Sequence, residues 1–102
     1  MPPPRRKGFE VDYSTLVSAS GDPLSAASIA IYRAALNKLA AAGFKTKKDL
    51  LDKQKEVVKS IEERLPEKAK RRVALSAIFR VLQDVPNDKR EAYYQAFQRA
   101  KD

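Results

Sequence analysis

The chain has no cysteine, no histidine and no tryptophan, and only three glycines and one methionine among its 102 residues. Without cysteine there is no disulfide, no thiolate metal site and no thiol nucleophile. Without histidine the chain lacks the usual general base and the commonest zinc ligand. Gly8, Gly21 and Gly43 lie too far apart to form a glycine-rich phosphate loop. These absences predict that the protein is not an enzyme and has no cofactor, no metal and no small-molecule substrate.

Long apolar runs are missing as well. No stretch approaches the roughly 20 apolar residues of a membrane-spanning helix, and no apolar signal-peptide core follows Met1. We therefore expect an intracellular protein, cytoplasmic or nuclear, that is not secreted and has no membrane partner.

Positive charge, by contrast, is abundant. The 21 Lys and Arg residues against 13 Asp and Glu residues give a formal net charge of +8 and a sequence pI near 9.9. Most of the excess lies within residues 25–85, so a basic tail does not account for it. A charge of this size favours a polyanionic partner, of which nucleic acid is the commonest and an acidic protein the alternative.

Apolar residues recur at helical spacing along most of the chain, and alanine, a strong helix former, is frequent. One apolar stripe consists of Ile29, Tyr32, Leu36 and Leu39. The pattern predicts an all-α fold, a single small bundle of about five helices. Residues 24–102 form the helical domain, and residues 1–23 form an extended or partly disordered N-terminal arm whose first eight residues are a proline-rich, basic leader. The expected helices span about residues 25–42, 46–51, 53–65, 66–84 and 89–100.

Short polar residues, glycine and proline mark the expected helix ends. Ser25, or alternatively Asp22, caps the first helix, and Gly43 ends it. Thr46 and Asp49 have the spacing of a capping box, with Asp in place of Glu.

The later helices carry similar signals. Pro66 closes the third helix and can start the fourth from its first turn. Asn87 or Asp88 caps the fifth helix, and Asp88 and Glu91 again have capping-box spacing.

The fourth helix combines a basic start with an apolar second half. Its apolar residues are expected to be buried together with residues of the first and third helices. This predicted core consists of Leu75, Ile78, Phe79, Leu82, Tyr32, Leu36 and Ile61. In the fifth helix, Tyr93 or Tyr94 is expected to pack inward with Phe97.

Two basic clusters stand at predicted helix starts, Lys45–Lys48 and Lys68–Arg72. Free backbone N–H groups and the positive end of the helix dipole favour anions at such positions. The alternative is that these cations lie on solvated faces without a ligand. One continuous basic face over both clusters would favour DNA, whereas an exposed apolar groove would favour a protein partner.

Two segments carry a resemblance to a known family. The first helix reads Ser25-x-x-Ser28-x-x-x-Tyr32-x-x-x-Leu36-x-x-Leu39, and the fourth reads Arg71-x-x-x-Leu75-Ser-Ala-Ile-Phe-Arg-Val-Leu82. Over about residues 24–82 the chain resembles the core-binding domain of phage-type tyrosine recombinases. The resemblance implies a SAM-like helical bundle that clamps duplex DNA, as in an integrase. The histidine of the recombinase catalytic constellation is missing, so it does not imply recombinase activity.

The resemblance also implies site residues. Ser25 and Ser28 look like contacts to phosphates or base edges, and Lys68, Lys70, Arg71 and Arg72 look like contacts from the fourth helix. On charge alone we add the remaining candidates: Lys45, Lys47 and Lys48, and the leader residues Arg5, Arg6 and Lys7.

The sequence therefore predicts a non-enzymatic nucleic-acid-binding protein that contacts duplex DNA through phosphates at basic helix starts. A small module of this kind would fit a mobile element or a large DNA virus, in which case a viral factory or virion is its expected location. The alternative is a helical interaction or structural module whose basic face binds an acidic protein, with the basic leader as a tether or nuclear-import signal.

Overall fold

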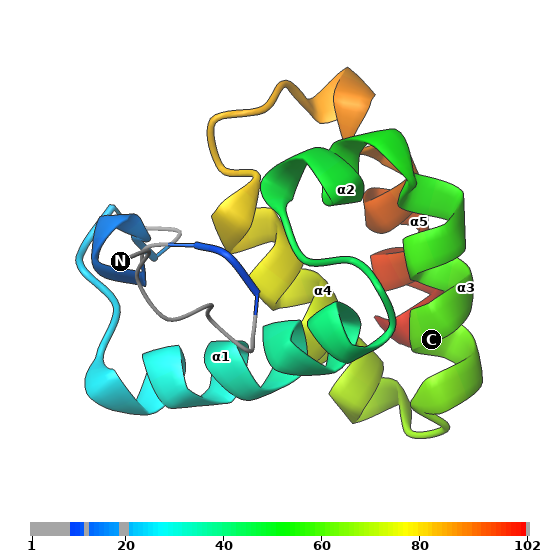
Figure 1. The fold of residues 1–102 in the computed structure, drawn as a ribbon, viewed down its shortest axis with the longest axis horizontal. Coiled ribbons are helices and arrows are strands. Elements are labelled where there is room, and N and C mark those ends of the chain that lie inside the picture. The colour runs from blue at the N-terminus through cyan, green and yellow to red at the C-terminus, as the bar shows by residue number, and fades with distance from the viewer. Residues whose placement is uncertain (1–8, 12, 19–20, 102) are drawn as a thin grey trace, which may run out of the picture.

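A computed structural model describes residues 9–11, 13–18 and 21–101 of the chain, and these residues form a bundle of five α-helices (Figure 1). Among them the only β pairing is two isolated bridges, Glu10 with Thr46 and Val17 with Pro23. This confirms the predicted all-α class. The elements in chain order are η1 (Tyr13–Thr15), α1 (Ala26–Ala41), α2 (Lys47–Asp52), α3 (Gln54–Arg64), α4 (Lys68–Val81), η2 (Asn87–Lys89) and α5 (Glu91–Lys101), where η denotes a 3-10 helix.

Helix α4 is the element on which the others assemble. It packs most extensively against α1 and α5, while α3 packs mainly against α5 and continues almost directly from the short α2 (Figure 1). As a result, α4 runs between α1 and α5. Its start lies beside the ends of α3 and α5, and its end lies near α2. No described helix is long and apolar enough to cross a membrane.

The predicted end of α1 at Gly43 is confirmed. Gly43 has a φ of +105°, a left-handed conformation that a residue without a side chain adopts at little cost. Its N–H donates to the Ala40 carbonyl at 3.0 Å, and the Phe44 N–H donates to the Leu39 carbonyl at 3.0 Å. This pair of bonds is a Schellman motif, which satisfies two of the last carbonyls of the helix.

The predicted caps of α1 and α2 are confirmed as well. The Ser25 hydroxyl accepts the Ser28 N–H at 3.1 Å, and the Thr46 hydroxyl accepts the Asp49 N–H at 3.2 Å. The Asp49 carboxylate reaches back to the Lys45 N–H at 3.1 Å, one residue before the position a standard capping box uses. This hydrogen bond from the Lys45 backbone lowers the pKa of Asp49.

The starts of α4 and α5 differ from the prediction. Pro66 lies before the N-cap residue Glu67, outside the first turn of α4. Asn87 and Asp88 cap nothing, because residues 87–89 form the 3-10 turn η2, in which the Arg90 N–H donates to the Asn87 carbonyl at 3.0 Å. Helix α5 therefore begins at Glu91, two residues later than the Lys89 start that the proposed capping box requires.

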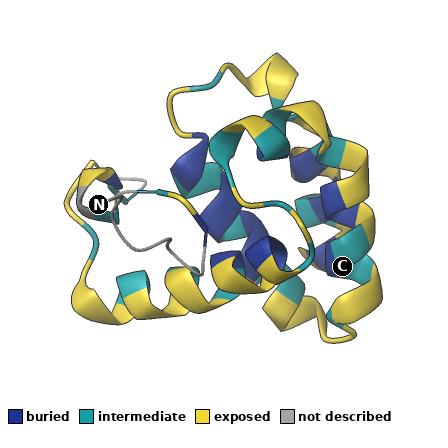
Figure 2. Cartoon of the chain, in the orientation of Figure 1, coloured by how far each residue is buried: buried dark blue, intermediate teal, exposed yellow. Residues whose placement is uncertain are grey.

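The core lies where α4 faces α1, α3 and α5 (Figure 2). Five of the seven predicted core residues are buried to 2% exposure or less: Leu36, Ile61, Leu75, Ile78 and Leu82. The remaining two, Tyr32 and Phe79, are only partly buried. Of the two tyrosines proposed for α5, Tyr93 is fully buried and its hydroxyl donates to the Leu50 carbonyl, whereas Tyr94 is exposed.

Phe79 lies at the edge of the core because Ile78 occupies the central position. Its ring packs edge to face on Phe97, with centroids 5.9 Å apart, and the Arg90 guanidinium lies 5.7 Å from its centroid. The helical stripe therefore continues from Leu75 through Ile78 to Leu82, and Phe79 borders the surface.

Part of the predicted N-terminal arm contacts the core. Phe9 is 2% exposed, its N–H donates to Asn37 Oδ1 at 3.2 Å, and the Glu10 N–H donates to the Lys45 carbonyl at 2.7 Å. This extended segment lies against the loop between α1 and α2. Residues 1–8 of the predicted arm lie outside the described residues.

Truncating Leu75 should destabilise the protein more than truncating Phe79. Leu75→Ala empties a position that is 1% exposed and should cost about 2–5 kcal/mol. Phe79→Ala removes a partly buried ring, so its cost should fall below the roughly 3–5 kcal/mol of a fully buried Phe. Urea unfolding of both variants measures the difference, and the reverse order of stabilities would show that the core is centred elsewhere.

Candidate nucleic-acid interface

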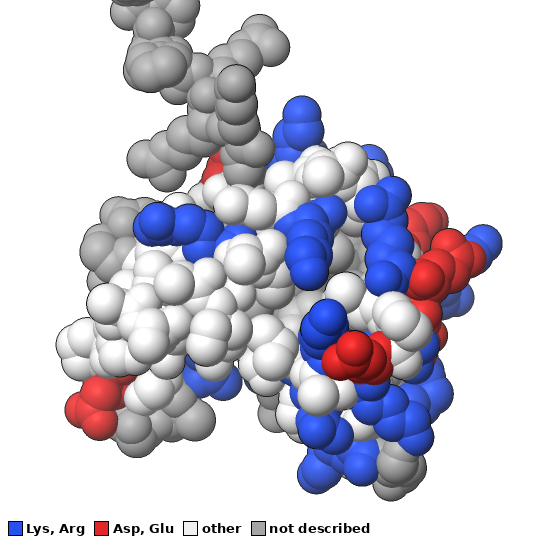
Figure 3. Space-filling view, turned by 90° about the horizontal axis from the view of Figure 1, so that it is seen from below, with Lys and Arg blue, Asp and Glu red and all other residues white. Residues whose placement is uncertain are grey.

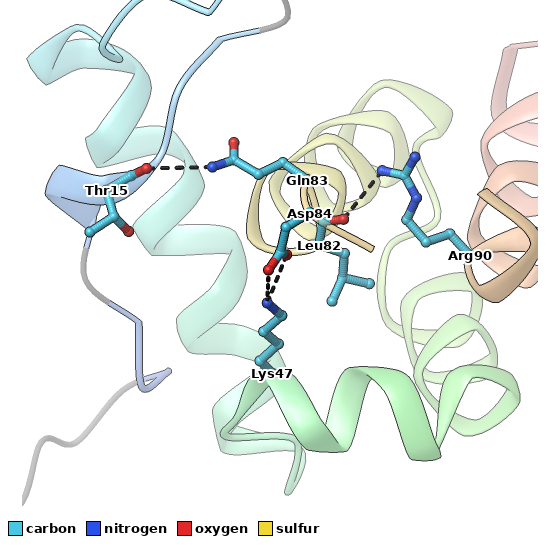
Figure 4. A network of polar contacts seen from close by, with 6 residues as sticks. All are labelled: Thr15, Lys47, Leu82, Gln83, Asp84 and Arg90. Carbon is cyan, nitrogen blue, oxygen red and sulfur yellow. Dashed lines mark hydrogen bonds and ion pairs between the residues drawn. The ribbon is translucent and has the colours of Figure 1, made fainter. Parts of the chain in front are cut away.

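The two basic clusters of the sequence lie at opposite ends of α4. Lys68 begins this helix, whereas Lys47 contacts Asp84, just beyond its other end (Figure 4). With 14 residues at about 1.5 Å each, α4 separates the two clusters by about 20 Å. The two clusters are therefore about one helix length apart along α4.

Lys47 is held in an ion pair. Its Nζ donates to both carboxylate oxygens of Asp84, at 2.7 and 2.9 Å. The hydrogen bond from Lys47 lowers the pKa of Asp84. In the same region Gln83 donates to the Thr15 carbonyl and Arg90 to the Leu82 carbonyl, both at 3.4 Å (Figure 4). Lys47 is thus part of the polar network around the end of α4, while the side chains of Lys45 and Lys48 are exposed.

Arg71 closes the end of the preceding helix. Its Nε donates to the Leu65 carbonyl at 2.6 Å and its Nη2 to the Glu62 carbonyl at 3.0 Å. Both carbonyls belong to the last turn and C-cap of α3, where four carbonyls have no partner within the helix. A cation at this position also opposes the negative end of the α3 dipole.

Arg72 likewise donates to a carbonyl in the last turn of another helix, α5. Its Nη1 donates to the Ala100 carbonyl at 3.0 Å, in the last turn of that helix. The start of α4 therefore lies beside the ends of α3 and α5, and two of its cations are directed at their carbonyls. The sequence predicted both arginines as DNA contacts, and the structure gives each of them a bond to the protein backbone.

Lys68 and Lys70 belong to the exposed part of the cluster. Lys70 Nζ lies 3.8 Å from Glu67 Oε1, and the two side chains are 60% and 65% exposed. An ion pair this exposed contributes less than about 1 kcal/mol and gives way readily to another anion. Lys70 can therefore meet a ligand from solvent, and Lys68 is exposed in the same turn.

Two cations that the sequence interpretation missed extend this surface. Lys38 and Arg64 lie in the last turns of α1 and α3, and both side chains line a hollow of about 320 Å³ that has Leu39, Ile61 and Ala74 among its other lining residues. Arg64 is also separated from Lys68 by only three residues of chain. We call the surface formed by Lys38, Arg64, Lys68 and Lys70 the basic end.

The basic end lies on a part of the molecule where positive side chains gather. In Figure 3, Lys and Arg side chains crowd the half that carries the ends of α3 and α5, while the half over the start of α1 is mostly uncharged. Lys38 and Arg64 each have no basic residue directly beside them in the sequence, so neither was included in a basic cluster. The sequence feature that could have identified them is their place in the last turn of a predicted helix, where a cation is favoured by the negative end of the helix dipole.

The two serines lie away from the basic end. Ser25 caps α1 and donates its hydroxyl proton to the Ser28 hydroxyl at 3.1 Å, at the opposite end of this 16-residue helix from Lys38. Ser28 shares a hollow between α1 and α4 with Arg72 and Ser76. The fold thus brings Ser28 and Arg72 together, as the prediction requires, but not with the lysines at positions 45–48. Arg5, Arg6 and Lys7 lie outside the described residues.

Comparisons with family models, with curated proteins and with solved structures give no match to this chain. The resemblance to the recombinase core-binding domain therefore stays a prediction from the residues of α1 and α4. Within the described part of the chain, no three acidic side chains gather in a way that would hold a metal ion.

Arg71→Ala should destabilise the protein by about 1–3 kcal/mol, because it leaves two carbonyls at the end of α3 without their charged donor. Lys70→Ala, a charge-matched control in the same turn, should change the unfolding free energy by less than about 1 kcal/mol. Both values come from urea unfolding at neutral pH. Equal effects of the two substitutions would contradict the assignment of Arg71 to the α3 terminus.

Lys47→Ala should raise the pKa of Asp84 towards its ordinary value, because the hydrogen bond that lowers it is lost. The measurement is an NMR titration of the Asp84 carboxyl group. A lowered pKa stabilises the fold above the unfolded-state pKa, and this contribution is lost as the pH falls through the folded-state pKa. The variant should therefore lose less stability than the parent protein on acidification. An unchanged Asp84 titration would show that the ion pair does not form in solution.

Proposed function

We propose that this protein is a non-enzymatic nucleic-acid-binding protein that holds duplex DNA by phosphate contacts from its basic end. The observation that carries the proposal is that Lys38, Arg64 and the pair Lys68 and Lys70 come from three different helices to the same end of the bundle. Its expected location is a compartment that contains DNA, the cytoplasm or the nucleus.

The start of α4 adds backbone donors to this surface. Its N-cap residue, Glu67, makes no side-chain hydrogen bond to the first turn. The first N–H groups of an α-helix have no partner within the helix, and together with the helix dipole they favour an anion. A DNA phosphate at this point would meet backbone N–H groups and the side chains of Lys68 and Lys70 together.

The arginines and the lysines of the Lys68–Arg72 cluster make different contacts, and this difference supports the same function. Arg71 and Arg72 fix the start of α4 against α3 and α5 through backbone carbonyls. Lys68 and Lys70 are exposed and belong to the surface that this anchoring holds in place. Of the contacts that the sequence resemblance implies, Lys68 and Lys70 belong to this surface, whereas Ser25 and Ser28 lie away from it.

The proposal predicts how binding depends on salt. Each phosphate neutralised on duplex DNA contributes about −0.9 to the slope of log K against log salt concentration. Four contacts from the basic end therefore give a slope of about −3.6. Because phosphate contacts carry no sequence information, duplexes of unrelated sequence should bind with similar affinities.

Replacing Lys68 and Lys70 together by Ala should weaken duplex binding and make the slope shallower by about 1.8, two contacts' worth. The matched control is the double variant with Ala at Lys45 and Lys48, which removes two exposed lysines from the other end of α4. Its slope should equal that of the parent protein. Fluorescence anisotropy of a labelled duplex, titrated at several salt concentrations, measures all three slopes.

Two outcomes would contradict the proposal. Absence of binding to any duplex at low salt would exclude DNA as the ligand. If the slope of log K against log salt concentration became shallower by the same amount in both double variants, binding would depend on the overall charge of the protein and not on the basic end.

A further inference from the structure

An exposed apolar groove runs along the surface where α1, α4 and α5 meet. Three large apolar side chains are exposed among the described residues: Ile31 at 52%, Val73 at 37% and Tyr94 at 58%. Ile31 and Val73 line one hollow of this surface, and Tyr94 lines the next. The exposed apolar side chains are therefore concentrated on one side of the molecule.

The two hollows form one continuous groove, because four residues line both of them. These shared residues are Ser28, Tyr32, Ser76 and Phe97. Beyond them the groove extends to Ile31 and Val73 in one direction and to Leu24, Phe79 and Tyr94 in the other. A contiguous apolar surface with polar side chains among its lining residues is typical of a site for another macromolecule.

The charged side chains of this α1–α4–α5 groove have a single sign. Arg72 and Arg80 are among the lining residues, and none of the carboxylates in the described ranges lines either hollow. Each arginine uses one Nη1 for a backbone carbonyl, Arg72 at 3.0 Å and Arg80 at 3.4 Å. A guanidinium has five N–H donors, so both retain donors for a carboxylate.

We propose that the α1–α4–α5 groove binds an acidic amphipathic helix of a partner protein. An amphipathic helix places apolar anchors at positions i, i+3 or i+4, and i+7 along one face, which suits a groove between packed helices. Carboxylates that flank these anchors would meet Arg72 and Arg80. Ser28 and Ser76 supply hydroxyl groups between the apolar residues.

Charge argues against the other occupants of such a groove. A second copy of this chain carries a net charge of +8 and would repel a groove lined by arginines. Nucleic acid would set its phosphates against an apolar floor formed by Ile31, Tyr32 and Val73. The groove contains none of the four cations of the basic end, although Ala69 brings it to the first turn of α4.

Selection from a displayed library of random helical peptides tests the proposal. Peptides that bind the protein should carry a net negative charge and apolar residues at i, i+3 or i+4, and i+7 spacing. Ile31→Glu and Val73→Glu should each weaken the binding of these peptides at least about tenfold. Each substitution places on the groove floor a negative charge that repels the acidic peptide. Ala30→Glu, on an exposed position of α1 that lines neither hollow, should leave the affinity unchanged.

Circular dichroism checks that each variant is folded. If Val73→Glu does not fold, Ile31→Glu decides the result, because Ile31 is the more exposed of the two residues. The proposal is wrong if selection yields no peptide that Ile31→Glu weakens, or if the selected peptides lack negative charge. It is also wrong if sedimentation shows a dimer that Ile31→Glu dissociates, because a second copy would then occupy the groove. Loss of duplex DNA binding in Ile31→Glu would assign the groove to DNA.

Discussion

Burial of one face of α4 between α1 and α5 is the interaction on which the rest of the structure depends. Leu75, Ile78 and Leu82 lie on this face, each at 1% exposure or less. Because α4 is fixed along its length, its first turn is held beside the ends of α3 and α5, and its last turn beside α2. The basic end, the ion pair of Lys47 and the groove over α1 and α5 are all set by this one packing arrangement.

The same packing gives different roles to cations that are neighbours in the sequence. The arginines at 71 and 72 use planar guanidinium groups to reach several backbone carbonyls, a geometry that the single ammonium of a lysine does not reproduce. The lysines at 68 and 70 keep exposed point charges. The positive charge of the cluster is therefore divided between backbone contacts and exposed lysines, and Lys38 and Arg64 line a hollow at the same end from other helices.

Local signals in the sequence were sufficient to predict most of the fold. Ser25, Thr46 and Gly43 mark their helix ends through their own backbone and side-chain chemistry. The apolar spacing predicts two buried residues of α4, Leu75 and Ile78, and its buried C-cap residue, Leu82. The errors arise where tertiary contacts decide. Phe79 matches the helical stripe, but Ile78 takes the core position, and residues 87–89 form a 3-10 turn in place of a cap. The site was harder to predict, because which cations turn inward depends on the carbonyls of other helices, and neither the basic end nor the groove is contiguous in the chain.

Helix α4 is anchored by its arginines, and we propose that it presents its lysines to DNA. The most direct measurement is an NMR titration of the isotopically labelled protein with a short duplex at low salt. If the basic end holds DNA, the backbone amides that shift most should belong to the first turn of α4 and to the last turns of α1 and α3. Residues 45–48 and the groove around Ile31 and Tyr94 should shift little. The largest shifts at residues 45–48 or in the groove, with the first turn of α4 unaffected, would contradict it.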